Sequence, residues 1–248
     1  MRPLLIKFDG FGIPSYGTML VISFIVALFL VKKEAKKYNI SPVVIENLAF
    51  WLMIGVIIGG RILYVIFHPH EFRDIISIFQ IWNGGMMFFG GFIGALIAGI
   101  IYVKRQKLSV SLLSDIISPS IALGEFFTRI GCFLNGCCFG IPTALPWGVH
   151  FPNGSFADSA GLDCSIHPTQ LYSSLFGLFL FFFLQRMLHR KHTQGEIFAY
   201  FLIFYAGFRF GVDFIRYYEN SANFLINQII SLVIVLAGIV LLIRAKKI

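Results

Sequence analysis

The sequence predicts an all-α integral membrane protein with seven transmembrane helices. Of its 248 residues, 57% are hydrophobic and 13% are charged, whereas charged residues make up about 25% of ordinary soluble domains. Apolar runs recur along the chain, and short basic clusters separate them. This length suits one helical bundle and hardly two independent domains. We therefore expect a single multi-pass membrane domain over residues 1–248.

Seven segments are long enough to cross the hydrocarbon core of a bilayer, which takes about 20 apolar residues. The second, fourth and sixth contain charged side chains, which inside a membrane usually have a partner or a function. The predicted spans are Ile13–Val31, Asn47–Phe67, Gly84–Val103, Leu108–Thr128, Pro168–Gln185, Ile197–Ile215 and Ala222–Ile243.

The distribution of Lys and Arg predicts the orientation. Thirteen of the 20 basic residues lie in clusters at alternate ends of the spans, within residues 32–37, 104–107, 186–191 and 244–247. Cytoplasmic ends carry this excess, so the N-terminus is expected outside and the C-terminus in the cytoplasm. The net charge of +8 thus reflects topology. No basic face with interleaved aromatic residues accompanies it, so we expect no nucleic-acid partner.

Four other arginines fall near the outer ends of the spans: Arg61, Arg129, Arg209 and Arg216. They could each extend separately to the interface. However, Arg209, Asp213 and Arg216 are spaced i, i+4 and i+7, which would place them on one helix face. A planar guanidinium matches phosphate oxygens. The arginines therefore predict a pocket for the head group of an anionic phospholipid.

A long connection, residues 129–167, follows the fourth span and is rich in Gly, Pro, Asn and Ser. Loops of this length are usually functional lids or disordered linkers. Several aromatic residues would allow this one to fold back onto the bundle. We therefore expect an extracytoplasmic lid loop between the fourth and fifth helices.

All four cysteines, Cys132, Cys137, Cys138 and Cys164, lie in this connection. Outside the cytoplasm they favour disulfides. Adjacent Cys137 and Cys138 are poorly placed to bond each other, so Cys132 and Cys164 would each take one of them. A reactive thiolate beside Arg129 is the alternative. The C-x4-C-C spacing differs from the C-x2-C of common metal sites, and we expect neither a metal nor a cofactor.

Five motifs resemble, in order, those of the bacterial prolipoprotein diacylglyceryl transferases. They are PSYGTML at Pro14–Leu20, GGRILYVIF at Gly59–Phe67, WNGGMMFFGGFIG at Trp82–Gly94, HPTQLY at His167–Tyr172 and YAGFRFGVDFIR at Tyr205–Arg216. The resemblance implies the same seven-span architecture in the bacterial cytoplasmic membrane. It also implies transfer of the diacylglyceryl group from phosphatidylglycerol to the lipobox cysteine of a prolipoprotein signal peptide, with release of glycerol phosphate.

The resemblance also implies roles for single residues. Arg129 would bind the lipid phosphate, and Arg209 would polarise the departing phosphate. Asp213 is the base best placed by motif, while Glu125 and a Cys137 thiolate are weaker choices. Residues that would shape the site or bind the lipid are Tyr16, also expected to be catalytic, and Asn135, Gly136, Gly140, Arg61 and Arg216.

The sequence departs from the family pattern at several polar positions. Cys132, Cys137 and Ile141 replace an Asn, a Glu and an Arg of the signature, and Phe89 replaces a His. These departures keep two alternatives open. One is an enzyme of the same scaffold with a different acceptor. The other is a non-catalytic membrane protein or transporter that binds anionic lipid.

Overall fold

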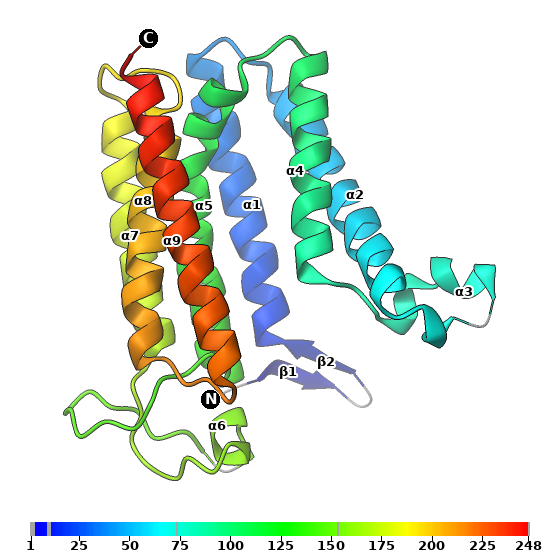
Figure 1. Ribbon diagram of the computed structural model, residues 1–248, viewed down its shortest axis with the longest axis vertical. Helices are drawn as coiled ribbons and strands as arrows, with labels where there is room; N and C mark the ends of the chain where they lie inside the picture. Colours follow the sequence, from blue (N-terminus) through cyan, green and yellow to red (C-terminus); the bar gives the residue numbers. More distant parts are fainter. Residues whose placement is uncertain (1–2, 9–10, 73, 153, 248) are drawn as a thin grey trace. The chain divides into compact units, whose positions relative to one another are not determined.

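The structure, a computed structural model, describes residues 3–8, 11–72, 74–152 and 154–247. Within these ranges it contains seven helices long and apolar enough to cross a membrane, which confirms the prediction of a multi-span helical protein (Figure 1). Each overlaps one of the predicted spans, with ends that differ by up to seven residues. They are α1 (Ser15–Lys37), α2 (Pro42–Phe67), α4 (Phe88–Arg105), α5 (Val110–Asn135), α7 (Thr169–Leu188), α8 (Glu196–Val212) and α9 (Ser221–Ala245).

Short elements that the sequence did not predict join these helices. Strands β1 (Leu4–Phe8) and β2 (Phe11–Pro14) pair antiparallel immediately before α1. The backbone N–H and the hydroxyl of Ser15 both donate to Pro3 O, at 2.8 and 3.1 Å, and so join the hairpin to the first turn of α1. The remaining elements are η1 (Pro69–Glu71), α3 (Ile75–Phe79), η2 (Ile81–Asn83), α6 (Phe156–Ser159) and η3 (Asp213–Ile215).

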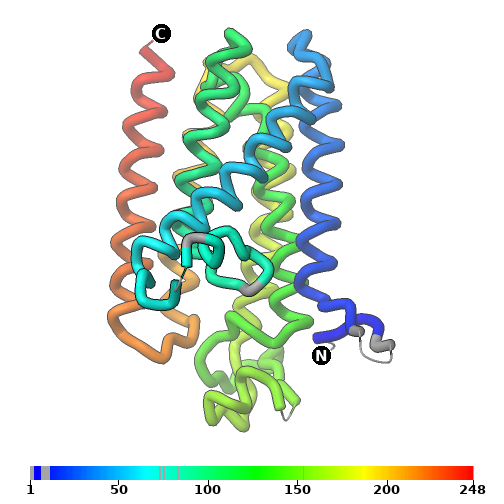
Figure 2. The backbone as a smooth tube through the Cα atoms, turned by 90° about the vertical axis from the view of Figure 1, so that its right-hand side faces the viewer, coloured from blue at the N-terminus to red at the C-terminus, as the bar shows by residue number. Residues whose placement is uncertain are grey.

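The chain divides into two compact units, one formed by residues 1–31 and 114–248 and the other by residues 32–113. In the first unit α8 packs along α7 and α9. Ser23 Oγ donates to Gly124 O at 3.3 Å and Ser174 Oγ donates to Phe126 O at 3.0 Å, which joins α1 and α7 to α5. The N-terminal hairpin and the connection from α5 to α7 lie at the same end of this unit (Figure 2).

Glycines bring α2 and α4 together in the second unit. A Cβ added to Gly59 would lie 2.3 Å from Gly90 O, and one added to Gly94 would lie 2.2 Å from Gly55 O. Each helix thus presents two glycines four residues apart, the spacing that lets membrane helices approach at their backbones. Two of the motifs found in the sequence, around Gly59 and Gly90, therefore form a helix interface.

The charged residue Asp115 in the fourth span caps another helix. Its carboxylate is fully buried and accepts from the backbone N–H of Gly195 at 2.6 Å and of Phe198 at 2.8 Å. These groups belong to the start of α8, where unpaired N–H donors and the helix dipole favour an anion. Asp115 therefore has a structural role.

Candidate active site

The end of α5 positions several of the predicted site residues. Gly136 adopts φ +78°, its N–H donates to Phe133 O at 3.2 Å, and Cys137 N–H donates to Cys132 O at 3.1 Å. This pair of bonds is the Schellman ending of a helix, with glycine in the left-handed position. The predicted loop over residues 129–167 therefore begins too early. Residues 129–135 are helical, because the helix continues as far as Gly136. We call residues 136–168 the lid segment.

The Schellman ending also gathers three cysteines. It places the residue after the glycine, Cys137, beside Cys132 on the last turn, and Cys137 Sγ lies 3.7 Å from Cys132 O. Cys138, at φ +63°, turns the chain back toward them. The three sulfur atoms all lie within 4.8 Å of one another. We call Cys132, Cys137 and Cys138 the cysteine cluster.

The cysteines are free thiols in this structure. Cys164, outside the cluster, packs against a small hydrophobic core of the lid segment that includes Phe139, Phe151 and Ile166. The predicted disulfide from Cys132 to Cys137 or Cys138 would therefore join cysteines that already lie close together. Cys164 is not part of this group. Disulfide formation stays a prediction.

The charge around the cluster favours a thiolate. Interactions with the neighbouring thiols of Cys132 and Cys137 stabilise the deprotonated Cys138, and Arg216 and Arg129 add positive charge nearby. Together these contacts hold the pKa of the Cys138 thiol far below its ordinary value. Of the three cluster cysteines, Cys138 is the one whose thiol pKa these surroundings lower.

Side chains from the first turn of α7 bind the backbone at the start of the lid segment, where Cys137 and Cys138 lie. Thr169 Oγ1 donates to Cys138 O at 2.8 Å, and the buried Gln170 donates through Nε2 to Cys137 O at 2.7 Å. His167 Nδ1 lies 3.1 Å from the hydroxyl of Tyr172. The HPTQLY motif therefore anchors the two cysteine carbonyls at the start of α7.

Gly140 lies where the lid segment meets the chain after α8. Its N–H donates to His167 O at 2.9 Å, and it forms an antiparallel bridge with Arg216. A Cβ at this position would lie 2.6 Å from both His167 Cβ and Ile215 O. The site therefore requires glycine here because two backbone segments approach too closely for a side chain.

Arg216 is not on the helix face predicted for it. The helix α8 ends at Val212, η3 follows, and Arg216 itself is extended, with φ −88° and ψ 143°. The i, i+4, i+7 stripe is therefore wrong at its last position, because the backbone leaves the helix to pair with Gly140. The guanidinium stands 5.5 Å from the centre of the Tyr218 ring, and across the described ranges it forms no salt bridge.

Arg209 and Asp213 form the part of that stripe that is correct. Arg209 Nη2 lies 3.1 Å from Asp213 Oδ1 and donates to the hydroxyl of Tyr218 at 3.2 Å. The Asp213 side chain is completely buried. Neither of its oxygens has an aligned hydrogen bond among the described residues, so the contact with Arg209 is an ion pair without good hydrogen-bond geometry. The carboxylate therefore keeps lone pairs available for a proton.

Arg129 is paired on its own helix. Its Nε donates to Glu125 Oε1 at 2.6 Å, with the two side chains only 14% and 19% exposed. Because the pair uses Nε, the two Nη groups can reach other acceptors. Glu125, which sequence reasoning placed among the weaker candidates for a base, is thus engaged with the arginine predicted to bind phosphate.

Electrostatic contacts connect these groups within the first unit. The positive charges of Arg129 and Arg216 both interact electrostatically with the Arg209 guanidinium. The half-exposed Tyr16 side chain interacts electrostatically with Arg129 and with the cysteine cluster. Tyr205 interacts with Arg129 and Arg209 as well as Glu125. Sequence reasoning missed a site position for Tyr205, although it lies one helical turn before Arg209 in a motif already singled out. One unit therefore brings together three of the four predicted arginines.

Comparison with known proteins identifies the family. A family model described as prolipoprotein diacylglyceryl transferase matches residues 3–244. The chain belongs to this family. Among curated relatives, a protein of Clostridium tetani named phosphatidylglycerol–prolipoprotein diacylglyceryl transferase is 36% identical over 241 residues, which cover 96% of each chain.

Two further members of the family carry the same name. The protein of Methylococcus capsulatus is 34% identical, with 98% of this chain and 95% of the relative covered. That of Chromohalobacter salexigens is 33% identical, with 99% and 92% covered. The resemblance found in the motifs is therefore confirmed over nearly the whole chain.

The fourth predicted arginine of this family member, Arg61, lies in the second unit and is bound by backbone. Its Nε donates to Ile78 O at 2.7 Å, Nη1 to Gly84 O and Gly85 O at 2.7 and 2.9 Å, and Nη2 to Ser77 O and Gln80 O at 2.8 and 3.3 Å. A guanidinium has five N–H donors, and these bonds use all five. The predicted contact of Arg61 with lipid would require one of these bonds to be released.

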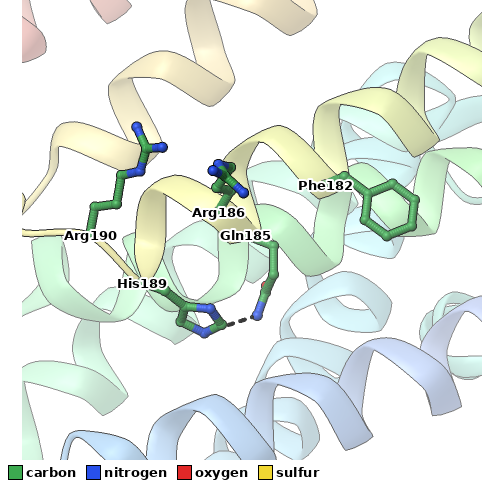
Figure 3. A pocket seen from close by; sticks show the side chains of 5 residues that line it. All are labelled: Phe182, Gln185, Arg186, His189 and Arg190. Atoms are coloured by element: carbon green, nitrogen blue, oxygen red, sulfur yellow. Dashed lines mark hydrogen bonds between the residues drawn. The ribbon is translucent and has the colours of Figure 1, made fainter.

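A hollow at the far end of α7 contains none of the predicted site residues. It has a volume of about 530 Å³ and is lined by Phe182, Gln185, Arg186, His189 and Arg190 (Figure 3). At 1.5 Å per residue, Arg186 lies about 25 Å along the helix from Thr169, which contacts the cysteine cluster. The predicted site residues therefore lie toward the other end of α7, and Arg190 offers a matched control for the predicted site arginines.

Proposed function

We propose that this protein transfers the diacylglyceryl group of phosphatidylglycerol to the lipobox cysteine thiol in the signal peptide of a prolipoprotein. The thiol sulfur attacks the glyceryl carbon that carries the phosphate. A carbon–sulfur bond forms, the carbon–oxygen bond to phosphate breaks, and glycerol phosphate leaves with the bonding electrons. The thiol proton passes to a base of the site. The family and the names of the relatives support this reaction.

The arrangement of three arginines in one unit is the observation that carries the proposal. Negative charge grows on the phosphate as the carbon–oxygen bond breaks, and fixed cations stabilise that charge most where water is excluded. The contact between Arg129 Nε and Glu125 orients the guanidinium and leaves its two Nη groups to donate to a phosphate. Arg216 has no carboxylate partner among the residues described. We assign phosphate binding to Arg129 and Arg216, and polarisation of the leaving group to Arg209.

Asp213 is the base of this proposal. Its buried oxygens lack aligned hydrogen bonds in the described part of the chain, and it is held beside Arg209. A carboxylate in that position can accept a proton while the neighbouring cation stabilises the departing phosphate. Tyr16, at the first turn of α1, and Asn135 and Gly136, at the end of α5, shape the approach to these groups.

The orientation proposed for the molecule follows from its basic clusters. The ends of the spans near Lys36, Arg105, Arg186 and Arg244 would be cytoplasmic, and the lid segment would lie outside. This orientation would put the cysteine cluster and the arginines of the first unit at the outer boundary of the bacterial cytoplasmic membrane. Both compact units would then belong to one membrane transferase domain, residues 1–248.

Reconstituted protein tests the reaction. Proteoliposomes containing phosphatidylglycerol would be given a lipobox peptide, and both the mass of the peptide and the release of glycerol phosphate would be measured. Arg129→Ala and Arg209→Ala should each lower turnover by at least about 100-fold. Arg190→Ala, at the far end of α7, should leave it unchanged. Equal activity of all four proteins would refute the arginine site.

A transferase of the same scaffold with a different acceptor is the second candidate. Cys132 and Cys137 favour it because they place thiols on the turn just beyond Arg129, where the family signature carries polar groups. Small thiols and other signal peptides would be compared in the same assay. Release of glycerol phosphate with another thiol but not with the lipobox peptide would select this candidate. Lipid binding without release of glycerol phosphate would instead indicate a non-catalytic lipid-binding protein.

A further inference from the structure

We propose that the cysteine cluster, Cys132, Cys137 and Cys138, binds one thiophilic d10 metal ion. The three sulfur atoms lie within 4.8 Å of one another, at the end of α5 and the start of the lid segment. The ion would take no part in the transfer reaction proposed above, although Arg129 and Arg216 lie close enough to act on both sites. Its occupant is identified by its ligands, which are three sulfur atoms and no carboxylate or imidazole among the described residues of the group.

The size of the triangle fits a bound ion. Metal–sulfur bonds of about 2.3 Å place the sulfurs of a trigonal site about 4.0 Å apart, and those of a tetrahedral site slightly closer. All three separations here are at most 4.8 Å. Small side-chain rotations would therefore close the triangle around an ion. A disulfide, in contrast, would bring two sulfurs to about 2.0 Å and leave the third as a thiol.

Backbone contacts hold the three ligands in place from different directions. Cys132 is fixed on the last turn of α5, and the Schellman ending holds Cys137 beside it. Thr169 and Gln170, on α7, donate to the carbonyls of Cys138 and Cys137. Such outer contacts orient the ligands of metal sites. The ligands are thus positioned before an ion arrives.

Charge complements the proposed ion. Three thiolates with a monovalent ion carry a net charge of −2, and with a divalent ion −1. Arg216 and Arg129 both act electrostatically on Cys138 and would offset that charge. Soft thiolate ligands select Cu⁺ and Zn²⁺ from the first-row metals. Cu⁺ would accept the three sulfurs alone, whereas Zn²⁺ would take water as a fourth ligand.

Binding is measured on the full-length protein in detergent. The protein would be reduced, desalted without oxygen and given one equivalent of Cu⁺ or of Zn²⁺ in separate experiments. After removal of unbound ion, elemental analysis gives the metal retained per chain. We expect one ion per chain in at least one arm, and the arm that retains it distinguishes the trigonal site from the tetrahedral one. Cys164→Ser is the matched control and should retain the same amount.

Variants of the cluster should lose the ion. Cys132→Ser, Cys137→Ser and Cys138→Ser each remove one ligand, and each should weaken retention at least about 10-fold, which is the scale seen for lesser changes around metal ligands. Alkylation followed by peptide mass spectrometry provides a test that does not depend on these variants folding. In the wild-type protein, the ion should protect Cys132, Cys137 and Cys138 and leave Cys164 reactive.

Three results would overturn the proposal. The first is that neither ion is retained, and the second is that retention is unchanged when the cluster cysteines are replaced. The third is a disulfide between Cys132 and either Cys137 or Cys138 in protein isolated without added oxidant. None of these measurements uses transfer activity, so they are independent of the proposed function.

Discussion

Arg129 donates through Nε to Glu125 Oε1 at 2.6 Å, one turn away on α5, and both side chains are largely buried. The pair fixes the direction of the guanidinium that we expect to bind the lipid phosphate. The carboxylate also keeps a positive charge near the membrane from being buried alone, which would cost several kcal/mol.

Replacing Glu125 tests this pairing. Glu125→Ala leaves the Arg129 charge buried without a partner and should lower the free energy of unfolding by about 3 kcal/mol. Glu125→Gln keeps an acceptor for Nε and should lower it less. Thermal unfolding in detergent would compare the two variants. Equal stability of Glu125→Ala and the wild-type protein would show that the ion pair does not stabilise the fold.

Substitution of Arg129, the arginine proposed to bind phosphate, should lower turnover. Arg129→Ala should remove stabilisation of the transition state worth on the order of 3 kcal/mol. Arg129→Lys should restore only part of it, because an ammonium lacks the planar fork and cannot donate to Glu125 and phosphate in the same geometry. The ratio kcat/KM for lipobox peptide transfer gives the comparison. Full activity of Arg129→Lys would show that a positive charge is sufficient at this position and that the planar guanidinium is not required.

Asp213 gives a separate prediction about proton transfer. Asp213→Asn keeps the size of the side chain but removes its ability to accept a proton, so kcat should fall by about 100-fold or more. Arg209 loses its ion-pair partner in the same variant. Phosphatidylglycerol binding is the control, because a base acts on kcat and its removal should leave lipid affinity nearly unchanged. A large loss of lipid affinity with unchanged kcat would place Asp213 in binding instead.

Much of the helical framework could be predicted because hydrophobic length is a local property of the sequence. All seven predicted spans correspond to long helices. Their ends were less predictable. The prediction ended the fourth span at Thr128, but α5 continues to Asn135 because the left-handed Gly136 ends it. The charges near Arg129 marked a boundary in hydropathy that is not a boundary of the helix.

The candidate site was predictable in its residue types and only partly in its geometry. Regular spacing placed Arg209 and Asp213 together correctly but also placed Arg216 on a helix that has ended. The bridge between Gly140 and Arg216 joins residues 76 positions apart, which no local pattern reports. The cysteine spacing argued against metal binding because it was compared with C-x2-C sites. A Schellman ending brings residues five apart into contact and provides another way to cluster thiols.

Arg61 is predicted to act on stability because its five donors bind the backbone of residues 77–85. Arg61→Lys retains the charge but offers three donors from a single nitrogen, so several of these carbonyls lose their partner. The variant should unfold at a clearly lower temperature, with a loss of about 2 to 3 kcal/mol. Protein that remains folded should keep its apparent affinity for phosphatidylglycerol. A selective rise in KM for the lipid without loss of stability would instead support the lipid-binding role predicted from the sequence.

Gly140 provides the sharpest test that the lid segment and the chain after α8 form one site. In Gly140→Ala the new Cβ would lie 2.6 Å from His167 Cβ and from Ile215 O, so one of the two neighbouring segments has to move. Displacement of the bridge shifts Arg216, and transfer activity should fall at least about 10-fold while the helices remain folded, because an error of about 1 Å at a catalytic group can cost 100-fold.

Gly207→Ala is the matched control. A Cβ there meets nothing within 4 Å, and alanine in a helix should raise stability by up to about 1 kcal/mol. Turnover and circular dichroism of both variants would be measured together, and equal activity of the two would show that the close approach at Gly140 does not position Arg216 for the reaction.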